Sequence, residues 1–148
     1  MSDLKKVREW LLTYPKPDPL LDLQVDYYAA QPENGSIAPS GLMEISRTED
    51  ILGNITVRNQ YNFALHFMLL KPVDGDAIAT SNAEWLMDLQ RWVQEQSILK
   101  QVPTFGNVPQ KETIKAQNGE LTWADEDGTG IYTVMLSIEF IKIYESTR

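Results

Sequence analysis

The chain has 148 residues, and its 21 Asp and Glu against 13 Lys and Arg give a formal net charge of −8. So acidic a chain has no general electrostatic attraction to phosphate, which argues against nucleic-acid binding. Hydrophobic residues make up 43% of the chain, enough for the core of a single domain over residues 1–148. With no cysteine and one histidine, His66, the composition excludes disulfides, thiolate metal sites and a multi-histidine site within one chain.

The sequence also predicts a protein made in a cytoplasm and kept out of membranes. No apolar stretch near the N-terminus is long enough to act as a secretion signal. The longest apolar run, Phe67 to Leu70, falls far short of the roughly 20 residues that cross a bilayer.

The first third of the chain predicts one helix followed by short strands. Apolar residues recur with helical spacing over residues 2–14, Ser2 is a suitable N-cap, and three prolines from Pro15 onward end the helix. Alternation over residues 21–28 then predicts a half-buried strand. Residues 31–41, which contain two prolines and two glycines, predict a loop before a short strand that begins at Met43.

Residues 55–71 form the longest alternating stretch of the sequence. Extended, they would reach about 50 Å at about 3.3 Å per residue, so the strand must bend or protrude beyond the core. Its first half is the less apolar, which makes that half the predicted protrusion. We expect it to contact a neighbouring subunit by strand addition. The candidate interface residues are Arg58, Asn59, Gln60 and Asn62.

The second half of the chain predicts one long helix and a β-meander. Ser81-x-x-Glu84 has the form of a capping box, and an apolar stripe follows it to Leu99. Asn118-Gly119 predicts a hairpin between two short strands, and residues 132–140 alternate as a last strand. The predicted order is α-β-β-β-α-β-β-β, an α+β fold with a curved antiparallel sheet and both helices packed on one face.

No constellation of residues in the sequence indicates a reaction. His66 lies on a predicted strand, where a structural histidine is the simplest interpretation. Asp125-Glu126-Asp127-Gly128 lacks the ligand spacing of a calcium loop, and no glycine-rich phosphate loop occurs. We therefore predict a protein that is not an enzyme, with no catalytic, metal or cofactor-binding residues.

Three segments carry a resemblance to a known family: residues 49–63, 82–96 and 103–106. Together they resemble tail terminator-type or minor capsid proteins of tailed phages and prophages of Gram-positive bacteria. The resemblance implies a virion structural protein, assembled in the cytoplasm of the bacterial host. It also implies a homo-oligomer, a hexameric ring that caps the tail tube. The implied partners are the tail tube protein and a head-completion protein, with DNA passing through the ring and no specific nucleic-acid binding.

A ring around DNA gives the acidic charge a role, because acids facing the lumen would repel the duplex. The candidate lumen-facing acids lie in predicted loops: Glu49, Asp50, Asp74, Asp76, Asp125, Glu126 and Asp127. Two alternatives remain open. One is a head–tail connector or minor capsid component of the same particle. The other is an unrelated small-ligand-binding α+β domain that uses carboxylates in an apolar pocket.

Overall fold

A computed structural model describes residues 2–16, 23–25, 34–70, 76–124 and 129–146. Over these ranges, two helices, a 3-10 turn and five strands follow one another, and their bounds are α1 (Asp3–Leu11), β1 (Leu23–Val25), β2 (Asn34–Glu49), β3 (Ile55–Leu70), α2 (Asp76–Ile98), η2 (Pro109–Lys111), β4 (Thr113–Ala124) and β5 (Thr129–Tyr144). The predicted α+β class is confirmed. The predicted order is matched only roughly, because the two short strands predicted on either side of Asn118-Gly119 form one strand, β4.

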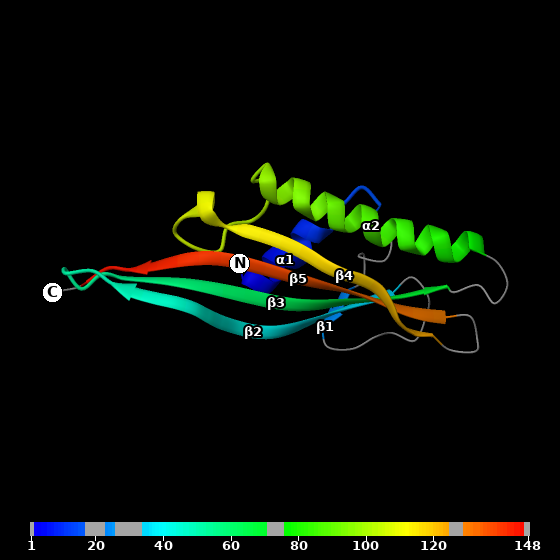
Figure 1. Ribbon diagram of the computed structural model, residues 1–148, viewed down its shortest axis with the longest axis horizontal. Coiled ribbons are helices and arrows are strands. Elements are labelled where there is room, and N and C mark those ends of the chain that lie inside the picture. Colours follow the sequence, from blue (N-terminus) through cyan, green and yellow to red (C-terminus); the bar gives the residue numbers. More distant parts are fainter. Residues whose placement is uncertain (1, 17–22, 26–33, 71–75, 125–128, 147–148) are drawn as a thin grey trace.

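The sheet is open, with the strand order β1-β2-β3-β5-β4 (Figure 1). The four long strands pair antiparallel, as predicted, whereas the short β1 pairs parallel with β2 at one edge. β3 is central and pairs with β5 along its full length, from Ile55 opposite Tyr144 to Leu70 opposite Thr129. The long alternating stretch therefore becomes the middle of the sheet.

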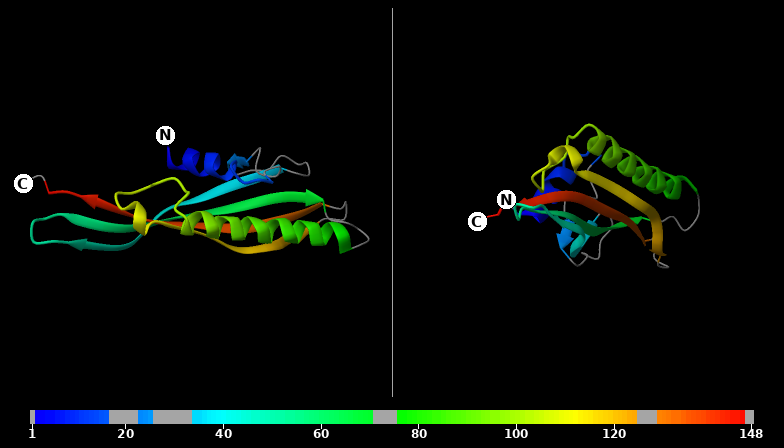
Figure 2. Two further views of the ribbon diagram at one scale, coloured as in Figure 1. Left: turned by 90° about the horizontal axis from the view of Figure 1, so that it is seen from above. Right: turned by 60° about the vertical axis from the view of Figure 1, so that its left-hand side comes forward.

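Both helices lie on one face of the sheet, as predicted (Figure 2). Ser2 caps α1, since its hydroxyl accepts a hydrogen bond from the Lys5 backbone N–H at 3.2 Å. The helices meet through Trp10 and Trp92, whose rings stack with centroids 5.0 Å apart. Beneath them lies a core of inward-facing strand residues, including Phe67, Leu65, Val134, Leu136 and Ile138.

The start of α2 differs from the prediction. The helix begins at Asp76, so Ser81 lies within it and does not cap it. Ala77 and Ala79 are good helix formers, and they allow the helix to extend toward its N-terminus past the local capping pattern. At the other end, Leu99 follows the helix and is exposed, so the predicted buried stripe ends earlier, at Val93.

The predicted loop over residues 31–41 is wrong from Asn34 onward, where β2 begins. β3 offers a partner along the whole of β2, and this long-range pairing outweighs the local turn signals. The pairing of β2 with β3 is interrupted by two register shifts, one between Pro39 and Leu42 and one between Glu44 and Ser46. Gly41, with φ +82°, lies in the first of them.

The predicted hairpin at Asn118-Gly119 is also wrong, because β4 continues straight through these residues. Asn118 has φ 61°, which suits its residue type, but it lies in a register shift against β5 between Gln117 and Glu120. Gly119 passes so close to α2 that a Cβ there would overlap the side chain of Gln90. The left-handed residue therefore forms a bulge beneath the helix instead of a chain reversal.

One end of the sheet continues past both helices (Figures 1 and 2). We call this part, residues 42–57 and 142–146, the extension. It consists of the far half of β2, the first residues of β3 and the end of β5. Of β3, only Ile55 to Val57 belong to the extension, and they lie between two partner strands. The residues predicted to protrude, Arg58, Asn59, Gln60 and Asn62, lie outside it.

Candidate functional site

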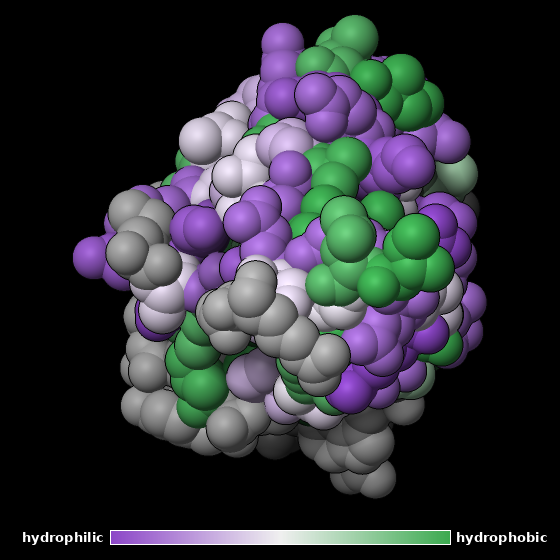
Figure 3. All heavy atoms as spheres, turned by 90° about the vertical axis from the view of Figure 1, so that its left-hand side faces the viewer, coloured by the Kyte–Doolittle hydropathy of each residue, from purple (hydrophilic) through white to green (hydrophobic). Residues whose placement is uncertain are grey.

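The extension exposes a set of large apolar side chains. Their exposed fractions run from 40% for Ile143 to 102% for Ile51, and the set is Leu42, Met43, Ile45, Ile51, Leu52, Ile143 and Tyr144. Seen end on, hydrophobic patches alternate with hydrophilic ones over this end of the molecule (Figure 3). A concentration of apolar surface at one end is the usual mark of an interaction site.

The tip of the extension is a tightly bonded turn between β2 and β3. The Asp50 carboxylate accepts hydrogen bonds from the backbone N–H groups of Leu52 and Asn54, each at 2.9 Å. These bonds hold the pKa of the Asp50 carboxyl below its ordinary value, and the bond from the Asn54 backbone N–H contributes most. Gly53 takes φ +86°, a conformation that other side chains rarely adopt.

A further bond ties this turn to the end of β5, because the Ser146 backbone N–H donates to the Asn54 side-chain oxygen at 2.7 Å. Two aliphatic side chains, Ile51 and Leu52, project from the turn into solvent. Sequence reasoning missed this pair. The available signal was two adjacent aliphatic residues inside an Asp-x-x-Gly-Asn turn, where polar residues are the rule.

The predicted interface residues on β3 divide between the two faces of the sheet. Arg58, Gln60 and Asn62 lie on the face away from the helices, where the Gln60 amide donates to Asn62 at 2.7 Å. Asn59 points to the other face and is only 5% exposed. Their contact by strand addition is a wrong prediction, because β3 is already paired on both sides. A contact through the side chains of Arg58, Gln60 and Asn62 stays a prediction.

The β4 edge of the sheet is sealed by side chains of α2. Ser97 accepts a hydrogen bond from the Ile114 backbone N–H at 3.0 Å, and Gln90 donates to the Ala116 carbonyl at 3.2 Å. Lys100, just beyond the helix, donates to the Glu112 carbonyl at 2.7 Å. Backbone groups that an added strand would need are thus taken by the chain itself.

The β2 edge carries other protection. β1 pairs with Gly35 to Ile37, and among the described residues no strand covers the edge beyond them. Pro39 offers no backbone N–H there, and the two register shifts twist the strand. Such features disfavour strand addition, so the apolar side chains, more than the backbone edge, are the accessible recognition surface of the extension.

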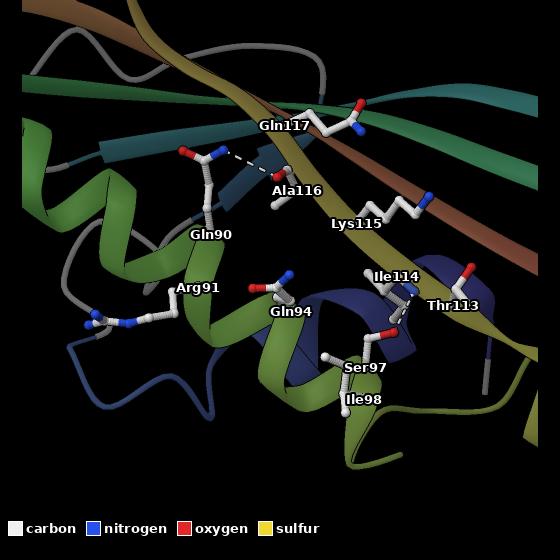
Figure 4. A pocket seen from close by; sticks show the side chains of 10 residues that line it. All are labelled: Gln90, Arg91, Gln94, Ser97, Ile98, Thr113, Ile114, Lys115, Ala116 and Gln117. Carbon is white, nitrogen blue, oxygen red and sulfur yellow. Dashed lines mark hydrogen bonds between the residues drawn. The ribbon is translucent and has the colours of Figure 1, made fainter.

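A groove of about 670 Å³ runs between α2 and β4 (Figure 4). Gln90, Gln94 and Ser97 project into it from the helix, and Ile114 and Ala116 face it from the strand. Arg91 and Lys115 flank it on the outer side of each element. Its lining contains no Asp or Glu, so this groove offers none of the carboxylates expected for the ligand-binding alternative.

The candidate acids do not form one cluster among the described residues. Glu49 and Asp50 lie at the tip of the extension, whereas Asp76 begins α2 at the opposite end of the molecule (Figure 1). Four further acids lie outside the described residues: Asp74, Asp125, Glu126 and Asp127. A lumen-facing role for these acids stays a prediction.

His66 is half-buried on the face of the sheet opposite the helices. Its Nδ1 lies 3.0 Å from the Thr133 hydroxyl, and burial lowers the pKa of the imidazole. Within the described ranges, no group of three His, Asp or Glu side chains is placed to hold a metal ion. In this part of the chain, neither helix is both long and apolar enough to span a membrane.

Comparison of the chain with protein-family models found no match, and comparison with curated proteins found none either.

Proposed function

We propose that this protein is a structural, non-enzymatic subunit of a tailed-phage or prophage virion, of the tail terminator type. In this role it forms a ring that caps the tail tube and joins it to the head. The observation that carries the proposal is the extension, a three-stranded part of the sheet that presents apolar side chains beyond the folded core. The family resemblance of residues 49–63, which include its tip, supports the same role.

The energetics of the extension favour an assembly role. Leaving a large aliphatic side chain in water forgoes about 1.5–3 kcal/mol of burial free energy. The extension leaves Leu42, Ile51 and Leu52 more than half exposed, and none of them packs into the subunit core. A partner that covers these side chains recovers this free energy on binding.

The partners follow from the same proposal. Copies of the chain contact one another in the ring, the tail tube protein binds one side and a head-completion protein binds the other. The net charge of −8 suits a ring that lets DNA pass without gripping it. Completed rings belong to the virion and assemble in the host cytoplasm.

The proposal is tested with tail tubes assembled from the tube protein of the same phage or prophage. The chain is mixed with these tubes, and negative-stain images and light scattering follow the products. We expect capped tube ends and a bound species of about six times 16.9 kDa. Bare tube ends together with monomers at every concentration would contradict it, and binding to the portal in place of the tube would identify a head–tail connector.

A further inference from the structure

We infer that Asn118 is a site of spontaneous deamidation, at which the folded protein forms aspartate and isoaspartate. The reaction at this position follows from the conformation and exposure of the Asn118-Gly119 pair and does not depend on the proposed function. The chain contains a second pair of the same composition, Asn34-Gly35. The two pairs share one intrinsic chemistry, and the fold makes only the first of them reactive.

Deamidation needs the side-chain amide of asparagine, the next backbone nitrogen and water. The Gly119 backbone nitrogen gives up its proton and attacks Cγ of Asn118. The new N–C bond closes a five-membered succinimide, and the amide nitrogen takes up a proton and leaves as ammonia. Water then opens the ring at either carbonyl, which gives aspartate or isoaspartate. Glycine is the residue that obstructs this attack least, because it has no Cβ.

The backbone at Asn118 lies outside the strand ladder. β4 is an edge strand of the sheet, and its pairing with β5 shifts between Gln117 and Glu120. Two residues of β4 thus face one residue of β5, and neither Asn118 nor Gly119 has a partner in the register of these two strands. Asn118 is also exposed, so water reaches the reacting groups.

The bulge itself favours this pair of residues. A Cβ at position 119 would overlap the side chain of Gln90, whose amide donates to the Ala116 carbonyl at 3.2 Å (Figure 4). Any larger residue there would displace Gln90 from this bond. Asn118 takes φ 61°, a left-handed conformation that asparagine adopts more readily than most residues. Local geometry therefore retains the combination that deamidates most easily.

The second pair is held inside the sheet. Gly35 is buried and lies between two strands, opposite Leu23 of β1 and Phe67 of β3. Its backbone nitrogen can attack the side chain of Asn34 only after these strands separate locally. Such an opening costs free energy that the exposed bulge does not require, so the fold protects Asn34.

The test is incubation of the purified chain in mildly alkaline buffer, followed by peptide mapping with mass spectrometry. In the folded protein we expect Asn118 to react at least tenfold faster than Asn34, which is about 1.4 kcal/mol in activation free energy. In guanidinium chloride the two should react at similar rates, since each then precedes an unhindered glycine. Equal rates in the folded protein would overturn the inference. So would an intact Asn118 over a period in which the unfolded chain reacts.

Ion-exchange chromatography gives a second measurement, because deamidation adds one negative charge to the folded chain. An acidic species should accumulate at the rate at which Asn118 is lost, and Asn118→Asp should elute with its aspartate form. Asn118→Gly is the matched control, since glycine suits φ 61° and carries no amide. In this variant the acidic species should form at least tenfold more slowly. Its accumulation at the wild-type rate would contradict the assignment to Asn118.

Discussion

The two ends of the sheet are built from the same strands but are used differently. At the covered end, two helices bury one face of β3 and β5, and Phe67 and Leu136 are fully inaccessible. In the extension β2, β3 and β5 continue without helices, and Leu42 on β2 and Ile51 in the turn after it are exposed. Strand pairing anchored in a core can therefore carry a surface whose apolar side chains stay exposed.

Truncation of a core residue at the covered end should have the largest effect. Phe67 is fully buried, and its ring packs against that of Trp85 with the ring centroids 5.0 Å apart. Phe67→Ala should lower the free energy of unfolding by about 3–5 kcal/mol, measured by urea denaturation, because it removes buried surface and leaves a cavity. A loss below about 1 kcal/mol would mean that the helix-covered end is not the source of stability.

A substitution at the boundary between the two ends should have an intermediate effect on the free energy of unfolding. The buried Glu112 carboxylate accepts hydrogen bonds from the backbone N–H groups of Phe105 and Gly106, at 2.7 and 3.1 Å. It thereby fixes a loop whose Asn107 bonds β5 at Ile141 and Ile143. Glu112→Ala should cost about 1.5–3 kcal/mol of unfolding free energy, since two amides lose a charged acceptor.

Glu112→Gln is the control for this prediction, because a glutamine carbonyl still accepts one of the two bonds. Its loss of unfolding free energy should be smaller than that of Glu112→Ala. If the two variants have the same free energy of unfolding, the hydrogen bonds from the loop to Glu112 do not contribute to stability.

The pH dependence of stability should show a small contribution from His66. Burial lowers the pKa of the folded imidazole below its ordinary value of 6.5. The unfolded chain therefore takes up the proton first as pH falls, and the stability contributed by the neutral imidazole is lost below about pH 6.5. Urea denaturation between about pH 7.5 and about pH 5 should show a shallower decline for His66→Gln than for wild type. The same pH dependence of stability in wild type and His66→Gln would contradict this contribution of His66.

The smallest effect on stability is expected in the extension. Ile45 is 41% exposed and lies outside the core, and threonine is equally suited to a strand. Ile45→Thr should change the unfolding free energy by no more than about 0.5 kcal/mol in the same urea assay. A loss comparable to that of Phe67→Ala would show that the extension belongs to the core.

Periodicity predicted those parts of the fold in which local pattern and tertiary pairing agree. α1, with its Ser2 cap, has unbroken helical spacing. The long strand from Ile55 and the last strand have unbroken alternation. Two of the errors fall where turn residues occur within paired strands. Pro39 and Asn118 favour turns locally, but β3 pairs with β2 around Pro39 and β5 pairs with β4 around Asn118, and the turn signals become bulges.

The candidate site was less accessible to sequence reasoning. Alternation identified β3 as too long for the core, but it could not show that two neighbouring strands extend with it. Exposure of Ile51 and Leu52 depends on the Asp50 turn and on the absence of a helix above it, and neither is a periodic feature. The groove joins residues from α2 and β4 that lie about 20 positions apart, so only the fold brings them together.

The most direct measurement is tube capping by a variant with two changes in the extension, Leu42→Ser and Ile45→Ser. Its urea denaturation should match that of wild type within about 1 kcal/mol, since neither side chain belongs to the core. Negative-stain counts of capped tube ends should fall at least tenfold. Capping at the wild-type level by this stable variant would contradict the assignment of the extension as the assembly surface.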